Sequence, residues 1–276
     1  MSEAEMPDAG QSEKINKIES ENKRLREEIK RTEQERVEYL QNVSHQLVAP
    51  LNAIKWHIEN LTEGRIGYER GVKVLRSIYS QASIAVHLAK NFSLMSNLEG
   101  EHALSSLKEP LEEVNLHRLL INLSNDFQPL AWDQKIDIKV EDDQFDDAPC
   151  VLAMKPLISQ VFSNVIENAV KYSNQGSKII IHGRYVLSSD TFLVSIKNQG
   201  IPLPIEHEQE VFNRGFRTAD AQRKAPAGTG FGLYIARRII ESHEGKISAL
   251  TENGWTVFNI VLSVKGLKGK ARIRDA

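Results

Sequence analysis

The sequence has few of the features that mark a secreted, disulfide-stabilised or membrane-spanning protein. Cys150 is the only cysteine among 276 residues, so no disulfide forms within the chain and a reducing, cytoplasmic setting is the simplest expectation. No apolar run approaches the roughly 20 residues that a bilayer-spanning helix needs. Residues 1–10 are polar and acidic, unlike a signal peptide. We therefore expect no membrane contact within this chain, whether it is a soluble protein or a piece of a longer receptor.

An excess of charge of one sign is also missing. The 35 basic and 37 acidic side chains give a formal net charge of -2. This balance predicts neither nucleic-acid nor membrane-surface binding. With 41% hydrophobic residues, the chain has enough apolar material for one sizeable core and a smaller helical domain.

The N-terminal part shows helical periodicity after a short polar start. Residues 1–12 have no periodic apolar positions and are expected to form a disordered tail. Over 13–36, apolar residues recur at alternating spacings of three and four, which predicts a coiled-coil helix. Asn22 falls on this seam, where a buried Asn favours a parallel two-stranded pairing. The alternative is a solitary charged helix. The seam positions are Ile15, Ile18, Asn22, Leu25 and Ile29.

Residues 37–100 are expected to form a helical hairpin. The apolar seam of the preceding helix shifts by one residue and then continues. Pro50 is expected to kink the helix, and Gly64 and Gly67 are expected to end the helix. A second amphipathic stripe follows. One hairpin cannot bury both stripes, so two copies should form a dimeric four-helix bundle. The first stripe is Val37, Leu40, Ser44, Leu47, Leu51, Ile54, Ile58 and Leu61, and the second is Leu75, Ile78, Ala82, Ala85, Ala89 and Phe92.

A second domain follows a polar linker at 101–113. Over 114–265, helices and strands are mixed irregularly, which predicts an α/β sandwich with a mixed sheet and makes the whole chain α+β. The tail at 266–276 is basic and expected to be solvated. The expected helices are 115–132, 155–172, 206–212 and 231–243, and the expected strands are 136–140, 178–186, 191–197, 246–250 and 256–264.

A glycine-rich turn runs directly into one of these helices. The segment Gly228-Thr-Gly-Phe-Gly-Leu233 allows close backbone approach to a ligand. The free N–H groups at the start of the following helix favour an anion such as a triphosphate. Taken alone, the pattern fits a simple helix-capping turn equally well.

The helix at 155–172 carries a polar face that favours the ligand interpretation. Asn164, Asn168 and Lys171 project from one side, beside Glu167 and Tyr172. The alternative is a solvated face, but Asn lowers helix propensity and is a poor choice for one. Amide oxygens suit Mg²⁺, and Lys suits phosphate.

Two further segments complete the pattern. Asn198-Gln-Gly-Ile-Pro-Leu-Pro204 follows a predicted strand, and Gly200 would permit a tight turn beneath a flat ring. The stretch from Phe212 to Gly228 can fold over a ligand as a lid. Arg217 and Arg223 in it could reach phosphates, although loop arginines are more often solvated.

The order of these segments resembles that of the ATP-binding domain of sensor histidine kinases of two-component systems, which is of the GHKL type. Ser44-His-Gln-Leu-Val-Ala-Pro-Leu51 resembles the phosphoacceptor segment of that family, and the hairpin resembles its dimerisation and phosphotransfer domain. The resemblance covers residues 37–264. It implies a kinase that uses ATP and Mg²⁺, phosphorylates His45, and passes the phosphoryl group to an Asp of a response regulator receiver domain.

The resemblance also implies roles for individual residues. His45, Gln46 and Lys171 would be catalytic, and Asn164 and Asn168 would hold the metal. Asn in place of the water-activating Glu of related ATPases favours transfer to protein over hydrolysis. The implied ATP-binding set is Asn164, Asn168, Lys171, Tyr172, Asn198, Gly200, Arg217, Gly228, Thr229, Gly230, Gly232 and Leu233.

The residues themselves agree with His45 as the acceptor. Ser44 and Leu47 lie on the seam, so His45 faces the flank of the bundle, where a second domain can reach it. Imidazole is partly uncharged near neutral pH and is then a nucleophile. The other histidines, His57, His87 and His243 among them, are expected to be surface bystanders.

Four positions depart from the family pattern. Gln46 replaces an acidic residue and cannot take a proton, so autophosphorylation is expected to be slower. Ala49 stands where Thr or Asn usually positions water for dephosphorylation. Asn198 replaces the adenine-reading Asp, and Pro202 replaces a glycine. These changes motivate an alternative, a degenerate kinase acting as a dimeric nucleotide-binding scaffold. A protein-serine kinase of the same fold is a third possibility.

Overall fold

The computed structural model describes residues 9–63, 68–98, 110–141, 145, 150–226 and 228–264. The chain divides into two compact units, residues 1–44 and 45–276, and each is described by itself. Within the described ranges, no helix has both the length and the apolar character needed to cross a bilayer.

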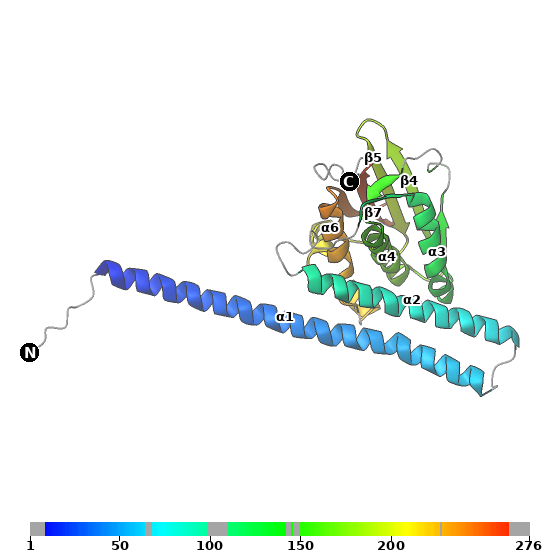
Figure 1. Cartoon of the computed structure of the whole chain (residues 1–276), viewed down its shortest axis with the longest axis horizontal. Helices are drawn as coiled ribbons and strands as arrows, with labels where there is room; N and C mark the ends of the chain where they lie inside the picture. The colour runs from blue at the N-terminus through cyan, green and yellow to red at the C-terminus, as the bar shows by residue number, and fades with distance from the viewer. Residues whose placement is uncertain are drawn as a thin grey trace, which may run out of the picture. The chain divides into compact units, whose positions relative to one another are not determined.

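The first helix, α1, runs from Ala9 to Thr62 without interruption (Figure 1). The expected coiled-coil segment and the first hairpin helix are therefore one continuous helix. Residues 9–12 are helical, although the sequence places them in a disordered tail. Pro50 lies inside α1, which continues on both sides of it. Gly64 and Gly67, expected to end the helix, lie outside the described residues.

The second hairpin helix, α2, spans Tyr68–Leu98 and packs on the following domain. The Tyr79 hydroxyl donates a hydrogen bond to Asp126 Oδ1 at 3.1 Å, and the His87 ring lies 5.2 Å from that of Phe127. Burial, with a smaller contribution from Lys90, lowers the pKa of His87 to about 4. His87 is thus an interface residue between helices and not the surface bystander that the sequence suggests.

The C-terminal domain is built on one mixed five-stranded sheet, as expected. The β2–β4 pair is parallel, and the other pairs are antiparallel. A separate two-stranded sheet pairs β1 (Glu112–Val114) with β3 (Val151–Ala153). The order in the main sheet is β2 (Asp137–Val140), β4 (Lys178–Val186), β5 (Thr191–Asn198), β7 (Trp255–Ser263) and β6 (Lys246–Glu252).

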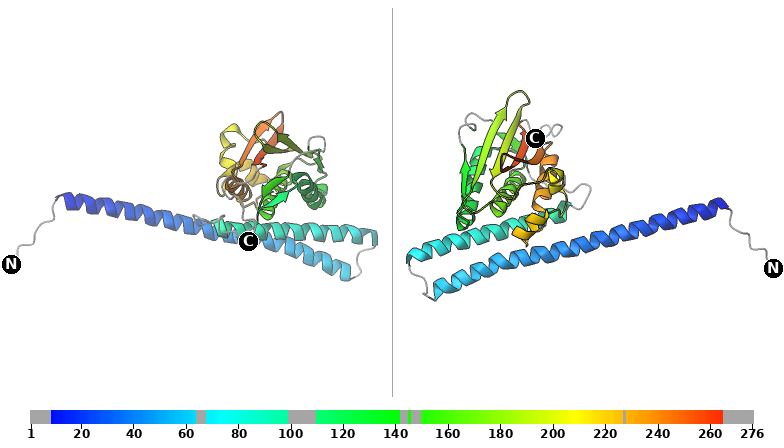
Figure 2. Two further views of the ribbon diagram at one scale, coloured as in Figure 1. Left: turned by 45° about the horizontal axis from the view of Figure 1, so that its top comes forward. Right: turned by 180° about the vertical axis from the view of Figure 1, so that it is seen from behind.

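One face of this sheet is covered by three helices, α3 (Leu116–Asp133), α4 (Lys155–Tyr172) and α6 (Gly232–Ser242) (Figure 2). The alternation along β5 directs Phe192, Val194 and Ile196 into the core beneath them, because successive side chains of a strand point to opposite faces. Asn198 is the next inward position in this series, so the apolar core ends in a polar side chain at that end of the strand.

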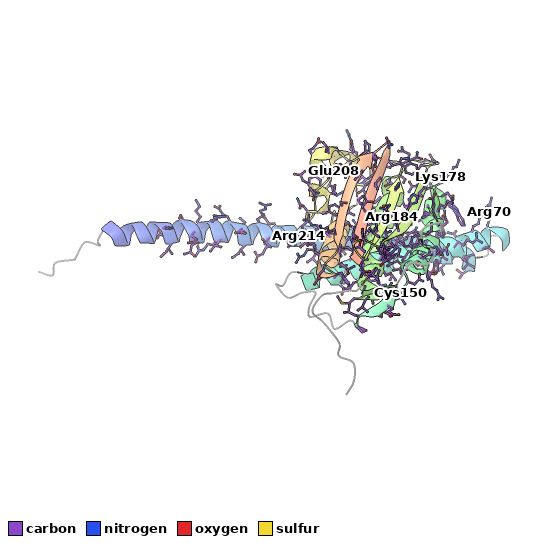
Figure 3. The ribbon with its side chains drawn as sticks, turned by 90° about the horizontal axis from the view of Figure 1, so that it is seen from above. Arg70, Cys150, Lys178, Arg184, Glu208 and Arg214 are labelled. Carbon is purple, nitrogen blue, oxygen red and sulfur yellow. The ribbon has the colours of Figure 1, made fainter. Side chains whose placement is uncertain are left out.

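The structure corrects the sequence-based element bounds at three places. Neither β1 nor β3 was expected, and β1 begins inside the expected linker at 101–113. The predicted helix at 206–212 is a pair of short 3-10 turns, η2 (Ile205–His207) and η3 (Glu210–Phe212). The short helix α5 (Ala219–Lys224) lies in the stretch expected to be flexible, and Thr218 caps it by accepting a hydrogen bond from Ala221 N. Figure 3 shows the side chains on this framework, with Lys178 and Arg184 marking β4.

Candidate functional site

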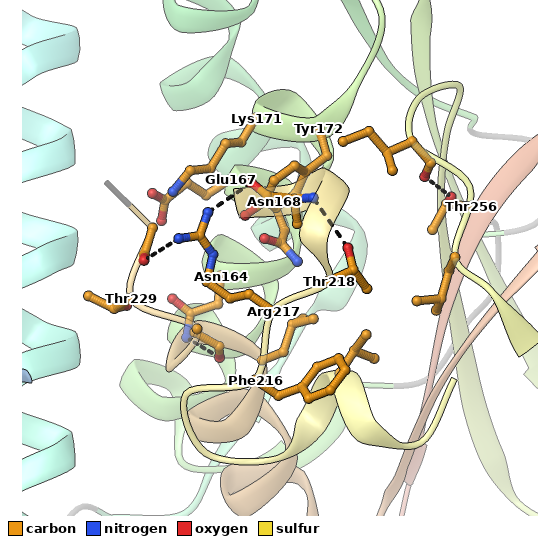
Figure 4. A pocket seen from close by; sticks show the side chains of 18 of the residues that line it. Asn164, Glu167, Asn168, Lys171, Tyr172, Phe216, Arg217, Thr218, Thr229 and Thr256 are labelled. Carbon is orange, nitrogen blue, oxygen red and sulfur yellow. Dashed lines mark hydrogen bonds between the residues drawn. The ribbon is translucent and has the colours of Figure 1, made fainter. Parts of the chain in front are cut away.

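A pocket of about 1020 Å³, open mouth included, lies at the end of β5 between α4, α6 and the segment that contains α5 (Figure 4). Nearly all of the predicted site residues line it, although they come from distant parts of the sequence. His45 and Gly200 do not. The predicted residues that line the pocket are Gln46, Asn164, Asn168, Lys171, Tyr172, Asn198, Arg217, Gly228, Thr229, Gly230, Gly232 and Leu233.

The wall formed by α4 is polar because three of its turns place charged and amide side chains on one face. Asn168 and Lys171 are half-buried, and Glu167 lies with them in the pocket. Burial raises the pKa of the Glu167 carboxyl, and the nearby Lys171 opposes this effect. The sequence pointed to this helix face but assigned no role to Glu167.

The first Asn of this helix is held by other amides. Asn164 Oδ1 accepts hydrogen bonds from Asn91 Nδ2 at 2.8 Å and from Gln160 Nε2 at 3.2 Å. Asn164 Nδ2 donates to the carbonyl oxygen of Gly232 at 3.0 Å. No sequence motif marks Asn91, which lies on α2, 73 residues before Asn164.

The glycine-rich turn has the geometry that an anion site requires. Gly230 has a φ of 72°, and a Cβ there would lie 2.7 Å from the carbonyl carbon of Gly215, so only glycine fits. The turn leads into α6, whose N-cap residue Phe231 makes no side-chain capping bond. The first N–H groups of a helix have no partner within the helix, so those of α6, which begins at the pocket-lining residue Gly232, can bind a ligand.

The floor of the pocket lies where β5 ends and the antiparallel β7 begins. Asn198 is buried, and it is the register partner of Thr256 on β7. The Thr256 hydroxyl donates to the carbonyl oxygen of Ile201 at 3.0 Å, which holds the loop after β5 against the sheet. Thr256 also lines the pocket, but no sequence motif marks it because its place depends on strand register.

The structure explains the glycine at position 200 by close packing and not by the predicted tight turn beneath a ligand ring. A Cβ at this position would lie 2.1 Å from the carbonyl oxygen of Tyr172. Gly200 also forms a β-bridge with Ser173. The glycine therefore allows the loop after β5 to pack against the end of α4, and it does not itself line the pocket.

Two cations hold the lid segment, residues 212–228: Arg217 bonds within the segment, and Lys224 bonds the segment to the end of α4. Arg217 lines the pocket, and its side chain is among those drawn in Figure 4. Its guanidinium donates to the carbonyl oxygens of Ala221 and Gly228, each at 2.8 Å, and of Pro226 at 3.2 Å.

Lys224 is the second of these cations. Its Nζ donates to the carbonyl oxygens of Tyr172 at 3.0 Å and Ser173 at 2.5 Å, and burial lowers its pKa. Arg223 instead pairs with Asp220 and is exposed, so it does not contribute to the pocket.

The predicted acceptor, His45, directly precedes a residue that lines the pocket. His45 is exposed on α1, and the following residue, Gln46, is half-buried and lines the pocket. His243, expected to be a surface bystander, is buried at 4% exposure. Its Nε2 accepts a hydrogen bond from Met154 N at 3.2 Å, so it is a core residue.

The donor set fits Mg²⁺ held largely by a nucleotide. Among the residues that the structure describes, no three His, Cys, Asp or Glu side chains gather as a metal cluster. Mg²⁺ commonly uses one or two protein oxygens together with substrate phosphates and water. Asn168 can supply such an oxygen in the pocket.

Comparison with known proteins agrees with this geometry. Residues 154–266 match the family described as histidine kinase-, DNA gyrase B- and HSP90-like ATPase. The chain is 29% identical over 226 residues to the histidine protein kinase SaeS of Staphylococcus epidermidis, covering 81% of this chain and 62% of that protein. It is 28% identical to SaeS of Staphylococcus aureus, over 86% of this chain and 66% of that protein. The chain thus spans less than two thirds of the length of these relatives.

Two solved histidine kinases share the fold. Full-length ShkA, solved with AMPPNP, is 18% identical with a TM-score of 0.55, and the match covers 83% of this chain and 46% of ShkA. AdeS of Acinetobacter baumannii is 20% identical with a TM-score of 0.51, covering 80% of this chain and 98% of AdeS. At these identities the likeness establishes the arrangement of elements, a helical segment followed by an α/β domain.

Proposed function

Because residues 154–266 match the histidine kinase-, DNA gyrase B- and HSP90-like ATPase family and the chain is similar to the histidine protein kinase SaeS, we propose that it is an ATP-dependent protein-histidine kinase that phosphorylates His45. ATP would bind in the pocket with its phosphates at the start of α6. The phosphoryl group would then pass to an Asp of a response regulator receiver domain.

One observation carries the proposal. The pocket that gathers Asn168, Lys171 and the Gly228–Gly232 turn is also lined by Gln46, the neighbour of His45. A nucleotide bound there would have its phosphates beside the helix that bears the acceptor. Positioning of this kind is the main requirement of phosphoryl transfer, because the protein contributes little covalent chemistry.

The transfer step can be written in terms of these groups. An unprotonated ring nitrogen of His45 attacks the γ-phosphorus, a P–N bond forms, and the bond from that phosphorus to the β,γ-bridging oxygen breaks. ADP leaves with the bonding electrons, and the proton on the other ring nitrogen passes to solvent because Gln46 cannot accept it. Bound Mg²⁺ would neutralise phosphate charge, with Asn168 and Lys171 orienting the triphosphate.

The proposal includes a dimer and a partner protein. We expect two copies to join through the α1–α2 hairpin. In single chains Leu51 and Leu75 are 54% and 58% exposed, which leaves apolar surface for a second copy. We also keep the expected cytoplasmic setting, where ATP and a soluble receiver domain are available.

The decisive test uses the purified chain and its His45→Ala variant, incubated with Mg²⁺ and γ-labelled ATP. We expect label only when His45 is present, lost in acid and kept in alkali, as a phosphohistidine requires. The variant should lose at least 99% of the incorporation, because no other group in the proposal can accept the phosphoryl.

Three other outcomes would redirect the assignment. Equal labelling of the His45→Ala variant would remove His45 as the acceptor, and acid-stable label would point to a serine kinase of the same fold. A folded dimer that binds nucleotide but takes no label would favour the scaffold alternative, which Gln46, Ala49, Asn198 and Pro202 motivate.

A further inference from the structure

Three amide side chains from two helices meet at the wall of the pocket, which Asn91 and Asn164 line. Gln160 and Asn164 of α4 are only 2% and 4% exposed, and Asn91 of α2 is half-buried. Gln160 Nε2 donates to Asn91 Oδ1 at 2.8 Å and to Asn164 Oδ1 at 3.2 Å, and Asn91 Nδ2 donates to Asn164 Oδ1 at 2.8 Å. Asn164 Oδ1 therefore accepts two hydrogen bonds, which matches the two lone pairs of an amide oxygen.

The other end of the Asn164 amide reaches the phosphate-binding turn. Its Nδ2 donates to the carbonyl oxygen of Gly232 at 3.0 Å, and Gly232 is the first residue of α6. The orientation of the amide follows from its partners, because a reversed Asn164 would place its NH₂ against two donors and its oxygen against a carbonyl. A continuous hydrogen-bonded path thus runs from α2 through Asn164 to the start of α6.

We propose that Asn164 is a positioning residue for the start of α6 and not a ligand of Mg²⁺, and that Asn91 and Gln160 hold it in this role. This inference rests on the proposed function in one respect, that the pocket takes a nucleotide. It replaces the sequence-based expectation of two Asn metal ligands with Asn168 alone. It also means that the hairpin, through Asn91, influences the turn that receives the phosphates.

The variant Asn91→Ala separates the two roles of Asn164 without adding charge. If Asn164 positions α6, removing its hydrogen bond to Asn91 should weaken ADP binding about threefold, and the loss should be the same with Mg²⁺ and with EDTA. A threefold loss corresponds to about half a kcal/mol to one kcal/mol, which is the net contribution of a typical hydrogen bond. If Asn164 instead binds the metal, freeing its oxygen should tighten binding only when Mg²⁺ is present.

The variant Asn164→Asp gives an independent result. A carboxylate still accepts from Asn91 and Gln160 and is a stronger Mg²⁺ ligand than an amide, but it cannot donate to the Gly232 carbonyl. We expect binding of Mg-ADP to weaken about tenfold, as for a broken buried hydrogen bond. Binding at or above the wild-type level in Mg²⁺ would identify Asn164 as a metal ligand and overturn the inference.

Both variants should be measured by calorimetry on the full chain, with melting curves to establish that each is folded. Ser93→Ala is the matched control, since Ser93 is exposed on α2 two residues from Asn91. Asn91→Ala indistinguishable from Ser93→Ala would overturn the inference while leaving the proposed function intact. A wild-type chain that binds no nucleotide would remove the proposed function itself and the inference with it.

Discussion

At the scale of single residues, the environment of a side chain and not its type decides what it does. Three histidines of this chain have three different environments. His45 is exposed and directly precedes the pocket residue Gln46, His243 is buried and bonded to the backbone, and His87 is half-buried between α2 and α3. The sequence singled out His45 through its neighbours, but the burial of the other two depends on packing between distant segments and left no local pattern.

His87 leads to a prediction of pH dependence. Burial and the nearby Lys90 lower its pKa to about 4 in the folded chain, from an ordinary value of 6.5, and the Asp126 carboxylate partly opposes this shift. The unfolded chain therefore binds the proton more readily between these values, and the free energy of unfolding should fall as pH drops through this window. The full difference corresponds to about 3 kcal/mol as an upper bound, with about 1 kcal/mol lost between pH 7 and 5.5.

Urea unfolding of the wild type and His87→Gln at pH 7 and 5.5 measures this contribution. We expect the variant to lose about 1 kcal/mol less than the wild type on acidification, since Gln does not titrate. His45→Gln is the control, because it makes the same substitution at an exposed position outside the contact between α2 and α3. Parallel pH profiles for the wild type and His87→Gln would contradict the assignment.

At the scale of elements, backbone shape sets the phosphate-binding turn. Gly230 has a φ of 72°, and a Cβ there would meet the backbone of Gly215 and Phe216 within 3 Å. We expect Gly230→Ala to weaken nucleotide binding at least tenfold, because the turn must open to admit the methyl group.

Gly254 provides a matched control for that change. Its φ of 78° is similar, but a Cβ there would have no atom within 4 Å. Gly254→Ala should therefore carry the same backbone strain, of roughly 1–2 kcal/mol, without affecting nucleotide affinity measured by calorimetry. Equal affinities for the two variants would show that the close contact at Gly230 is unimportant for binding.

The elements also show what sequence reasoning can reach. The expected bounds of α4 and β4 agree with the structure, because α4 has strong apolar periodicity and because a β-branched run in β4 follows the turn at Gly176. The strands β1 and β3 have three residues each and pair across an intervening helix, so neither has a periodic pattern to detect. The helix α5 has six residues, lies in a polar segment and is capped by the Thr218 hydroxyl, so it also lacks a long periodic pattern.

The candidate site divides in the same way. The residues of the pocket that lie in contiguous motifs, such as Asn168 and Gly230, could be predicted because neighbouring residues in the sequence indicate their role. Asn91 and Thr256 could not, because a contact between α2 and α4 and the register of β7 against β5 place them there. The burial that raises the pKa of Glu167 is likewise a property of the assembled pocket.

At the scale of the whole molecule, the hairpin leaves apolar side chains that a single chain does not cover. The expected seam residues Leu51 and Leu75 are more than half exposed. Burying a leucine side chain fully is worth about 1.5–3 kcal/mol, and in a symmetric dimer each position is buried twice. A four-helix bundle would therefore gain several kcal/mol from these two positions alone.

The double variant Leu51→Asp/Leu75→Asp tests this assembly. Because each copy would place two carboxylates in an apolar seam, we expect the dissociation constant of the dimer to rise at least about a hundredfold. Light scattering would measure this change as a fall in molar mass. Trp56→Asp is the matched control, since Trp56 is 60% exposed but lies off the seam. A control that dissociates as readily as the double variant would place the dimer contact on another face of α1, and an unaffected double variant would mean that the hairpin stripes are not the interface.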